Sequence, residues 1–194
     1  WAKENNCVSI FDAGDVQANG FQIIEDDDPK QCITDGGASY MGFGCSAVLS
    51  SALSGNSFYP LALTGDGSFM MNPQVLIDAI EHKAEGCILI LDNRRMAAIS
   101  SLQMDQYGVD FATNDSVKVD YVAMASAFAG VNAIHGGYDI QSLVDASNSA
   151  RKFHGLSVIH LPVYYGPNEL GGFGAFGRWN VGVWSEDTQN LRHK

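Results

Sequence analysis

One acidic and one amide side chain stand where they could hold a divalent cation. Asp66 lies in Gly65-Asp66-Gly67, directly after an apolar run that begins at Pro60. Asn93 follows Asp66 by 27 positions (93 − 66), directly after a second apolar run. Carboxylate and amide oxygens are hard ligands that suit Mg²⁺ or Ca²⁺ and suit zinc poorly. Two protein oxygens leave most of a Mg²⁺ shell to other ligands, typically phosphate oxygens. These residues predict a site for a diphosphate bridged by magnesium.

The elements around these residues are predicted to form a βαβ unit. Residues 60–64 and 87–92 are apolar runs typical of buried strands. Between them, Asn72 is a good N-cap and Pro73 suits the first helical position, while Gly86 is placed to end the helix. Because parallel strands point their carboxyl ends at one edge of the sheet, the acid and the amide are expected to be neighbours.

The Gly-Asp-Gly motif with its spaced Asn resembles the thiamine diphosphate signature of the acetolactate synthase and pyruvate decarboxylase superfamily. The resemblance implies that Asp66, Asn93 and the backbone carbonyl of Arg95 bind Mg²⁺. It also implies cofactor contacts at the site residues Gly65, Gly67, Ser68 and Asn93. An ordinary α/β domain with a turn Asp and a strand-end Asn is the alternative interpretation.

A second motif, Gly36-Gly37-Ala38-Ser39-Tyr40-Met41-Gly42-Phe43-Gly44, resembles the GGxGxMGxG segment of acetolactate-synthase-like enzymes. The resemblance implies that Met41 wedges beneath the cofactor and that the Ser39 carbonyl accepts from the aminopyrimidine, with Gly37 in the same loop. Plain core packing is the alternative for Met41. The glycines also match a dinucleotide fingerprint, but a polar glycine loop precedes them where that fingerprint requires a strand.

Two further segments are expected near the same cofactor. Residues 7–11 predict a first buried strand, and the resemblance implies that Gly14 and Asp15 in the turn after it meet the diphosphate. Since an Asp side chain would repel phosphate, Asp15 is expected to point away. Residues 94–114 are predicted to be long and irregular, which favours a functional loop.

The resemblance implies that this loop covers the thiazolium, with Ala98 against the cofactor. Four of its polar side chains are candidates for binding a polar substrate, with simple surface placement as the alternative: Arg94, Arg95, Ser100 and Gln103.

The whole pattern predicts an α/β fold: a three-layer, doubly wound, mostly parallel sheet with helices on both faces. Further strands are expected at 131–135 and 156–162, and further helices at 45–53, 119–129 and 139–153. Residues 1–163 are predicted to form the cofactor-binding domain. Residues 164–194, rich in glycine and aromatics, are predicted to form an irregular arm that packs on a partner or closes the site. Within it, 178–183 loosely resembles the tail of trihydroxycyclohexanedione hydrolases.

Composition excludes several classes of partner. The 194 residues are 46% hydrophobic, without the run of about 20 apolar residues that a membrane helix needs. A net charge of −11 argues against nucleic acid and anionic membranes as partners. The four cysteines form no CxxC pair, which favours reduced thiols in a cytoplasmic protein. The histidines, interpreted as structural, have no carboxylate at a readable spacing: His82, His135, His154 and His160.

The resemblance covers only the part of these enzymes that binds the cofactor diphosphate. Their pyrimidine-binding domain, which supplies a glutamate to the cofactor ring, has no counterpart here. We therefore expect another polypeptide to complete the site in a hetero- or homo-oligomer. The chain is either one subunit of a two-subunit enzyme or the C-terminal piece of a longer one.

The resemblance implies C–C bond cleavage or ligation, in which a thiazolium carbanion adds to the carbonyl of a small-molecule substrate. Three functions stay open. One is a lyase or hydrolase acting on a 1,2-diketone or 2-oxo acid, with the tail favouring the dione hydrolases. Another is a two-subunit 2-oxo acid decarboxylase of the sulfopyruvate or phosphonopyruvate type. The third is a non-catalytic domain that binds the cofactor.

Overall fold

The computed structural model describes residues 1–113 and 117–163. The chain divides into two compact units, which are described separately below. Among the described residues, the first contains 1–93 and 119–163, and the second contains 94–113 and 117–118. The predicted arm at 164–194 lies outside the described residues, so the domain boundary at residue 163 stays a prediction.

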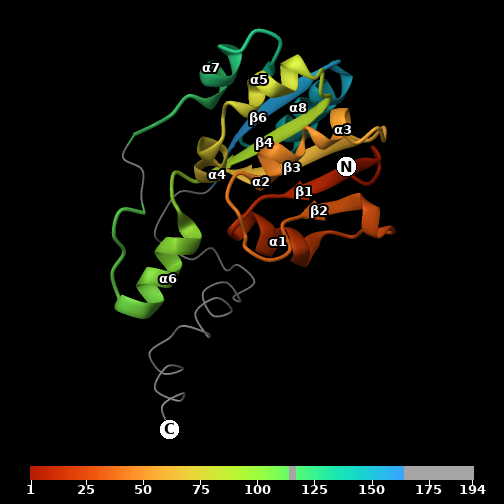
Figure 1. The fold of residues 1–194 in the computed structure, drawn as a ribbon. Helices are drawn as coiled ribbons and strands as arrows, with labels where there is room; N and C mark the ends of the chain where they lie inside the picture. The colour runs from red at the N-terminus through yellow and green to blue at the C-terminus, as the bar shows by residue number, and fades with distance from the viewer. Residues whose placement is uncertain (114–116, 164–194) are drawn as a thin grey trace. The chain divides into compact units, whose positions relative to one another are not determined.

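The first unit is built on six strands that are all parallel (Figure 1). Their order across the sheet is β2-β1-β3-β4-β6-β5. The prediction of an α/β fold with a parallel sheet is confirmed, and no antiparallel pair occurs among the described strands. The strands are β1 Cys7–Phe11, β2 Cys32–Thr34, β3 Tyr59–Gly65, β4 Gly86–Asp92, β5 Asn132–His135 and β6 Leu156–Pro162.

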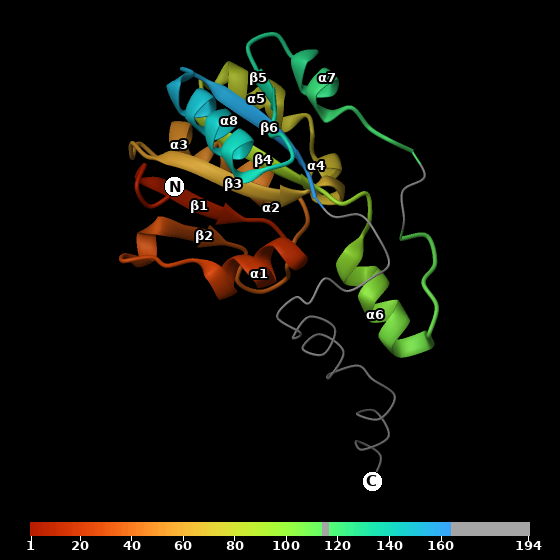
Figure 2. The same ribbon diagram turned by 180° about the vertical axis from the view of Figure 1, so that it is seen from behind.

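Helices cover both faces of this sheet, as predicted (Figures 1 and 2). Neighbouring residues of one strand enter opposite cores: Ile88 packs in one and Leu89 in the other. The helical elements of the first unit are α1 Asp15–Ile23, the 3₁₀ turn η1 Pro29–Gln31, α2 Phe43–Ala47, α3 Ser50–Leu53, α4 Asp66–Met71, α5 Val75–Glu81, α7 Tyr121–Ser126 and α8 Ile140–Lys152. Residues of α2, α4, α5 and α7 line the first core, and residues of α8 line the second.

The strand order has a switch point beside the predicted binding segments. From β1 the chain continues to β2 on one side, whereas β3 lies on the other side of β1 and leads on to β4. Ligands of open α/β sheets bind at such a switch point, beyond the carboxyl ends of the strands. The turn after β1 and the Gly-Asp-Gly motif after β3 both lie there, because Phe11 pairs with Leu63 in register.

The helix after β3 differs from the prediction. Asn72 does not begin a helix: it ends α4, which starts at Asp66, and α5 starts at Val75. Pro73 explains the break, because a proline disfavours helical backbone in the residue before it. Asn72 accordingly has a φ of −148°, and its Nδ2 donates to Ser46 Oγ at 2.9 Å.

The helix expected at 45–53 is also broken, into α2 and α3. Near the break, Ser50 Oγ donates to the Ala47 carbonyl at 2.6 Å and Ser51 Oγ donates to the Val48 carbonyl at 2.9 Å. Serine hydroxyls that bond back to preceding carbonyls compete with the helical ladder, which accounts for the interruption.

The second unit contains a helix where an irregular loop was predicted. Helix α6 spans Ala97–Tyr107, and Gly108 ends it in the left-handed conformation with a φ of 71°. Its sequence contains several good helix formers, and a C-terminal glycine is the usual stop. The prediction of irregular structure from 94 to 114 was therefore wrong over these eleven residues.

Two remaining predictions concern cysteines and membranes. All four cysteines lie in the described part of the chain and are free thiols, as predicted. No helix within residues 1–113 or 117–163 combines the length and the apolar character that crossing a bilayer requires.

Candidate functional site

Asp66 begins α4 directly after β3 and is only 4% exposed. Burial, and next to it the neighbouring carboxylate of Asp92, raise the pKa of its carboxyl to about 6. The N–H of Gly67 donates to Asp66 and opposes this shift. Two acidic side chains thus approach each other at the carboxyl ends of β3 and β4. The repulsion between two such carboxylates is relieved either by a shared proton or by a cation.

Asp92 was not among the predicted site residues. It ends β4 directly before Asn93, and its Oδ2 lies 2.8 Å from Nε2 of His160 on β6. Both side chains are buried, and the Tyr121 ring lies 5.3 Å from the His160 ring. The sequence shows no carboxylate at a readable spacing from His160 because the pair joins two strands at residues 68 positions apart, which leaves no local pattern.

The loop with the second motif folds back onto the turn after β1. The Gly14 N–H donates to Ser39 Oγ at 3.2 Å, and this hydroxyl donates to Oε1 of Gln17 at 3.2 Å. Ser39 has a φ of 51°, which is unusual for a residue other than glycine and often marks a functional position. Gly14 has a φ of 76° as the N-cap of α1, which explains the glycine there. The structure thus brings two predicted site residues together.

The two glycine motifs also touch. A Cβ placed on Gly67 would lie 3.4 Å from Cε of Met41. One placed on Gly42 would lie 3.4 Å from the Ser68 carbonyl oxygen, and Gly42 has a φ of 91°. Met41 therefore lies against the start of α4, and side chains larger than glycine would separate the two segments.

Asp12 directly follows β1, and its carboxylate connects the segments of this region through hydrogen bonds. It was not among the predicted site residues. It is 0% exposed. Its Oδ1 accepts from Gly42 N at 2.9 Å, and its Oδ2 accepts from Gly44 N at 3.0 Å and Thr64 Oγ1 at 3.0 Å. The one available signal was an acid directly after an apolar strand, which by itself does not distinguish Asp12 from Asp15.

The site has open space where a ligand would approach. A Cβ on Gly65 or Gly37 would meet no atom within 4 Å. Asp15 is the first residue of α1, and burial raises the pKa of its carboxyl to about 6. The donor set of acids beside free glycine backbone fits a cation held with an anionic ligand. No group of three or more His, Cys, Asp or Glu side chains within 1–113 and 117–163 is arranged to hold a metal by itself.

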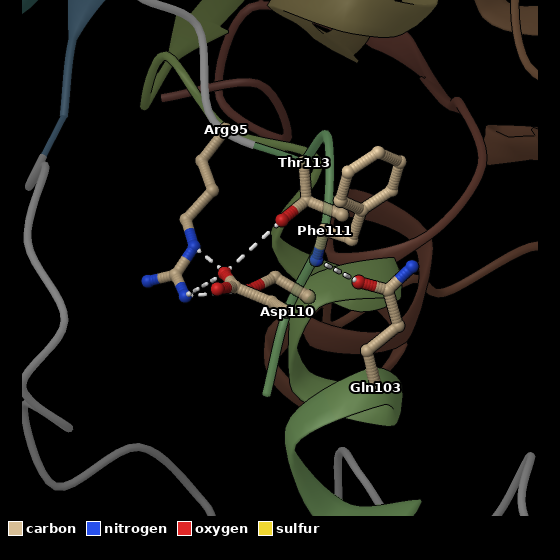
Figure 3. A network of polar contacts seen from close by, with 6 residues as sticks. Arg95, Gln103, Asp110, Phe111 and Thr113 are labelled. Carbon is tan, nitrogen blue, oxygen red and sulfur yellow. Dashed lines mark hydrogen bonds and ion pairs between the residues drawn. The ribbon is translucent and has the colours of Figure 1, made fainter. Parts of the chain in front are cut away.

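Arg95 and Ala98 belong to the second unit, where a polar network closes α6 onto the following segment (Figure 3). The Arg95 guanidinium donates to Asp110 Oδ2 at 3.2 Å and also to Ser100 Oγ. Ser100 Oγ donates to the same carboxylate at 2.6 Å, and Thr113 Oγ1 does so at 3.1 Å. The side chains of Arg95 and Ser100, predicted as candidates for substrate binding, are bound within this network.

Gln103 has a similar internal contact. Its Oε1 accepts from the Phe111 N–H at 2.7 Å (Figure 3). The network therefore explains why 95–113 forms a compact segment, and it uses three of the four side chains predicted to contact a polar substrate.

A hollow of about 670 Å³ lies at the opposite edge of the sheet, near the amino ends of β1 and β2. Asn6, Lys30 and Ser57 are among the residues that line it. It contains none of the predicted site residues, and the chemistry argued above stays at the carboxyl ends of the strands.

Known proteins resemble this chain in sequence. Residues 12–161 match the family described as "Thiamine pyrophosphate enzyme, C-terminal TPP binding domain". The chain is 34% identical over 184 residues to 3D-(3,5/4)-trihydroxycyclohexane-1,2-dione hydrolase of Lacticaseibacillus casei, covering 91% of this chain and 27% of the relative. It is 31% identical over 127 residues to the large subunit of acetolactate synthase isozyme 1 of Escherichia coli K12, covering 64% of this chain and 22% of the relative.

The fold has solved counterparts. Benzoylformate decarboxylase from Polynucleobacter necessarius superposes with a TM-score of 0.73 at 20% identity, covering 84% of this chain and 31% of that one. The chain spans about a quarter of the length of the two curated relatives. The family match covers both glycine motifs and the strand ends that carry the acids, and on this ground the chain belongs to the family of C-terminal thiamine pyrophosphate-binding domains of thiamine pyrophosphate enzymes.

Proposed function

We propose that this chain binds thiamine diphosphate through Mg²⁺ at the carboxyl ends of β1, β3 and β4. The observation that carries the proposal is the pair of buried acids, Asp66 and Asp92, beside the open backbone of Gly65. A cation would neutralise the pair, and a diphosphate would complete its coordination. The proposed metal ligands are Asp66, Asn93 and the Arg95 carbonyl.

The other predicted residues receive roles consistent with their places. Gly14, Gly65, Gly67 and Ser68 would border the diphosphate, with Asp15 beside them. Met41 would support the ring system from its position against Gly67, and the Ser39 carbonyl would accept a hydrogen bond from the aminopyrimidine. Gly37 and Ala98 complete the set of proposed cofactor contacts.

Thiamine diphosphate, when bound, supplies a carbon nucleophile for a substrate carbonyl and an electron sink for the adjacent C–C bond. We propose that the substrate is a 1,2-diketone or 2-oxo acid. The hydrolase match favours the dione side, because it extends over 91% of the chain while the acetolactate synthase match covers 64%. The side chains described here would position the cofactor and its metal.

We further propose that a pyrimidine-binding domain or subunit supplies the activating glutamate. Support comes from the relatives, because the chain matches only 27% of the hydrolase. An oligomer is therefore expected to form the complete site, and the free thiols fit a cytoplasmic setting.

Isothermal titration of the full chain with thiamine diphosphate, with and without Mg²⁺, tests cofactor binding. Asp66→Ala removes a proposed ligand, and Asp78→Ala removes an exposed acid of α5 as a matched control. We expect binding that requires Mg²⁺, is lost in Asp66→Ala and is unchanged in Asp78→Ala. Binding that ignores both Mg²⁺ and Asp66 would contradict the proposal.

Substrate class is tested with the chain and any α/β polypeptide that co-purifies with it. Turnover of a cyclic 1,2-dione would support the hydrolase assignment, whereas turnover of anionic 2-oxo acids alone would support a decarboxylase. Cofactor binding without turnover of either class would indicate a non-catalytic domain.

A further inference from the structure

The buried carboxylate of Asp12 connects three segments that are far apart in the sequence. Its own N–H donates to the Leu63 carbonyl at 3.0 Å, which fixes it to β3. Its side chain accepts from Thr64 at the end of β3 and from the backbone of Gly42 and Gly44, which lie 30 and 32 positions away. A side chain at position 44 would meet Asp12, since a Cβ there lies 3.0 Å from Asp12 Oδ2.

A second carboxylate holds the other end of the same loop. Asp35 Oδ1 accepts from the Gly37 N–H at 3.2 Å, and Oδ2 accepts from the Tyr40 N–H at 2.8 Å. These backbone bonds hold the pKa of Asp35 below its usual value. Met41 therefore stands between two backbone segments that are each held by a carboxylate. Asp35 holds the segment before it, and the buried Asp12 holds the segment after it.

We infer that Asp12 is a positioning residue for the cofactor. It fixes the distance between Met41 and the Gly65-Asp66-Gly67 motif. This inference rests on the proposed cofactor function. Since Asp12 binds the amide directly after Met41 and the hydroxyl directly before Gly65, it fixes the distance between the methionine and the diphosphate segment. The Asp35 carboxylate accepts from Gly37 and Tyr40 within its own loop, and these bonds fix the local turn.

Asp12→Asn tests this role with little change in size. The amide keeps one acceptor oxygen, but its NH₂ group must face the N–H of Gly42 in place of Oδ1 or the N–H of Gly44 in place of Oδ2, so at least one bond is lost. Met41 is proposed to contact the ring system of the cofactor and not the diphosphate. The substitution should therefore weaken Mg·thiamine diphosphate and spare Mg·pyrophosphate.

The measurement is the dissociation constant of each ligand, by titration of wild type, Asp12→Asn and Asp35→Asn. We expect Asp12→Asn to weaken Mg·thiamine diphosphate roughly 10- to 100-fold, the range seen when supporting residues behind a ligand are changed. Mg·pyrophosphate affinity should stay within about threefold, and Asp35→Asn should change either constant by less than Asp12→Asn does. Equal weakening of both ligands, or no weakening, would overturn the positioning role.

Amide hydrogen exchange without any ligand gives a second measurement that does not depend on cofactor binding. Gly42 and Gly44 should exchange faster in Asp12→Asn, and Gly37 and Tyr40 should exchange faster in Asp35→Asn. Unchanged exchange at Gly42 and Gly44 would overturn the inference even if the cofactor binds. If wild type binds no thiamine diphosphate while exchange responds as expected, the proposed function fails and Asp12 retains only its role in the loop.

Discussion

Two buried aspartates follow neighbouring parallel strands, and their surroundings are opposite. Asp12 after β1 is surrounded by donors: two glycine N–H groups and the Thr64 hydroxyl all lie within 3.0 Å of its oxygens. Asp66 after β3 faces a second acid, and its pKa is raised to about 6 by burial and by Asp92. A buried carboxylate surrounded by donors stabilises a structure, whereas two buried acids that face each other cost free energy until a proton or cation arrives. The first therefore shapes the crevice, and the second is suited to bind within it.

Removing the satisfied acid should produce the largest effect on stability. Asp12→Ala leaves at least three donors without their acceptor, and each unsatisfied buried donor costs about 1–3 kcal/mol. We expect a loss of roughly 3–5 kcal/mol in the free energy of unfolding, measured by urea denaturation at pH 7. A loss below about 1 kcal/mol would show that water replaces the carboxylate and that the contrast with Asp66 is smaller than described.

The acid that faces Asp92 should make stability depend on pH. The folded-state pKa of Asp66 is raised from 3.8 to about 6, so the folded chain holds a proton that the unfolded chain releases. Its contribution is fully present below pH 3.8 and is lost as pH rises through about 6. A shift of about two units corresponds to about 3 kcal/mol.

Urea denaturation between pH 4 and pH 7, without metal, measures this change. Asp66→Asn should reduce the decline relative to wild type. Asp15 carries a shift in the same direction, so Asp15→Asn is the control that isolates its share. An identical pH profile for wild type and Asp66→Asn would contradict the raised pKa.

Two glycine substitutions test the same contrast between Asp12 and Asp66, with a smaller expected effect on stability. Gly44→Ala brings a methyl group to 3.0 Å from Asp12, which should cost about 1–3 kcal/mol through overpacking. Gly65→Ala meets no atom within 4 Å and has a φ of −76°, so its stability should be unchanged or slightly higher. Thermal unfolding compares the two, and titration with Mg·thiamine diphosphate should show Gly65→Ala weakened despite its stability. Equal melting temperatures for the two variants would contradict the tight fit at Gly44.

The sequence predicted the framework because its pattern is local. The strands β1, β3, β4 and β6 are continuous apolar runs, and Asp139 stands before α8, where its side chain accepts from the Ser142 N–H at 2.8 Å. Boundaries were predicted less well where a local competitor acted, as Pro73 does by ending α4. Helix α6 was missed because its residues show almost no amphipathic pattern, and its stability depends on the Arg95–Asp110 network.

The residues of the candidate site likewise fall into those that could be predicted from the sequence and those that could not. Residues in motifs, such as Met41 and Gly67, could be predicted from the resemblance of those motifs to a known family, and the structure places the two residues in contact. Asp12 and Asp92 act through partners on other strands, and such pairing leaves no periodic pattern in one sequence. Their functional roles, like those of the motif residues, stay predictions until binding is measured.

Cys45 gives this region a reporter that requires no substitution. Its thiol is fully buried, lies 3.5 Å from Thr64 Oγ1, and has a pKa raised to about 12, chiefly by burial. A thiolate is the reactive form, so an alkylating reagent can modify Cys45 only when the surrounding segment opens. Alkylation of the half-buried Cys32 does not depend on this opening, so its rate serves as an internal reference. The ratio of the two alkylation rates, read peptide by peptide in a mass spectrometer, therefore follows the opening of the Asp12 contacts in the unaltered protein.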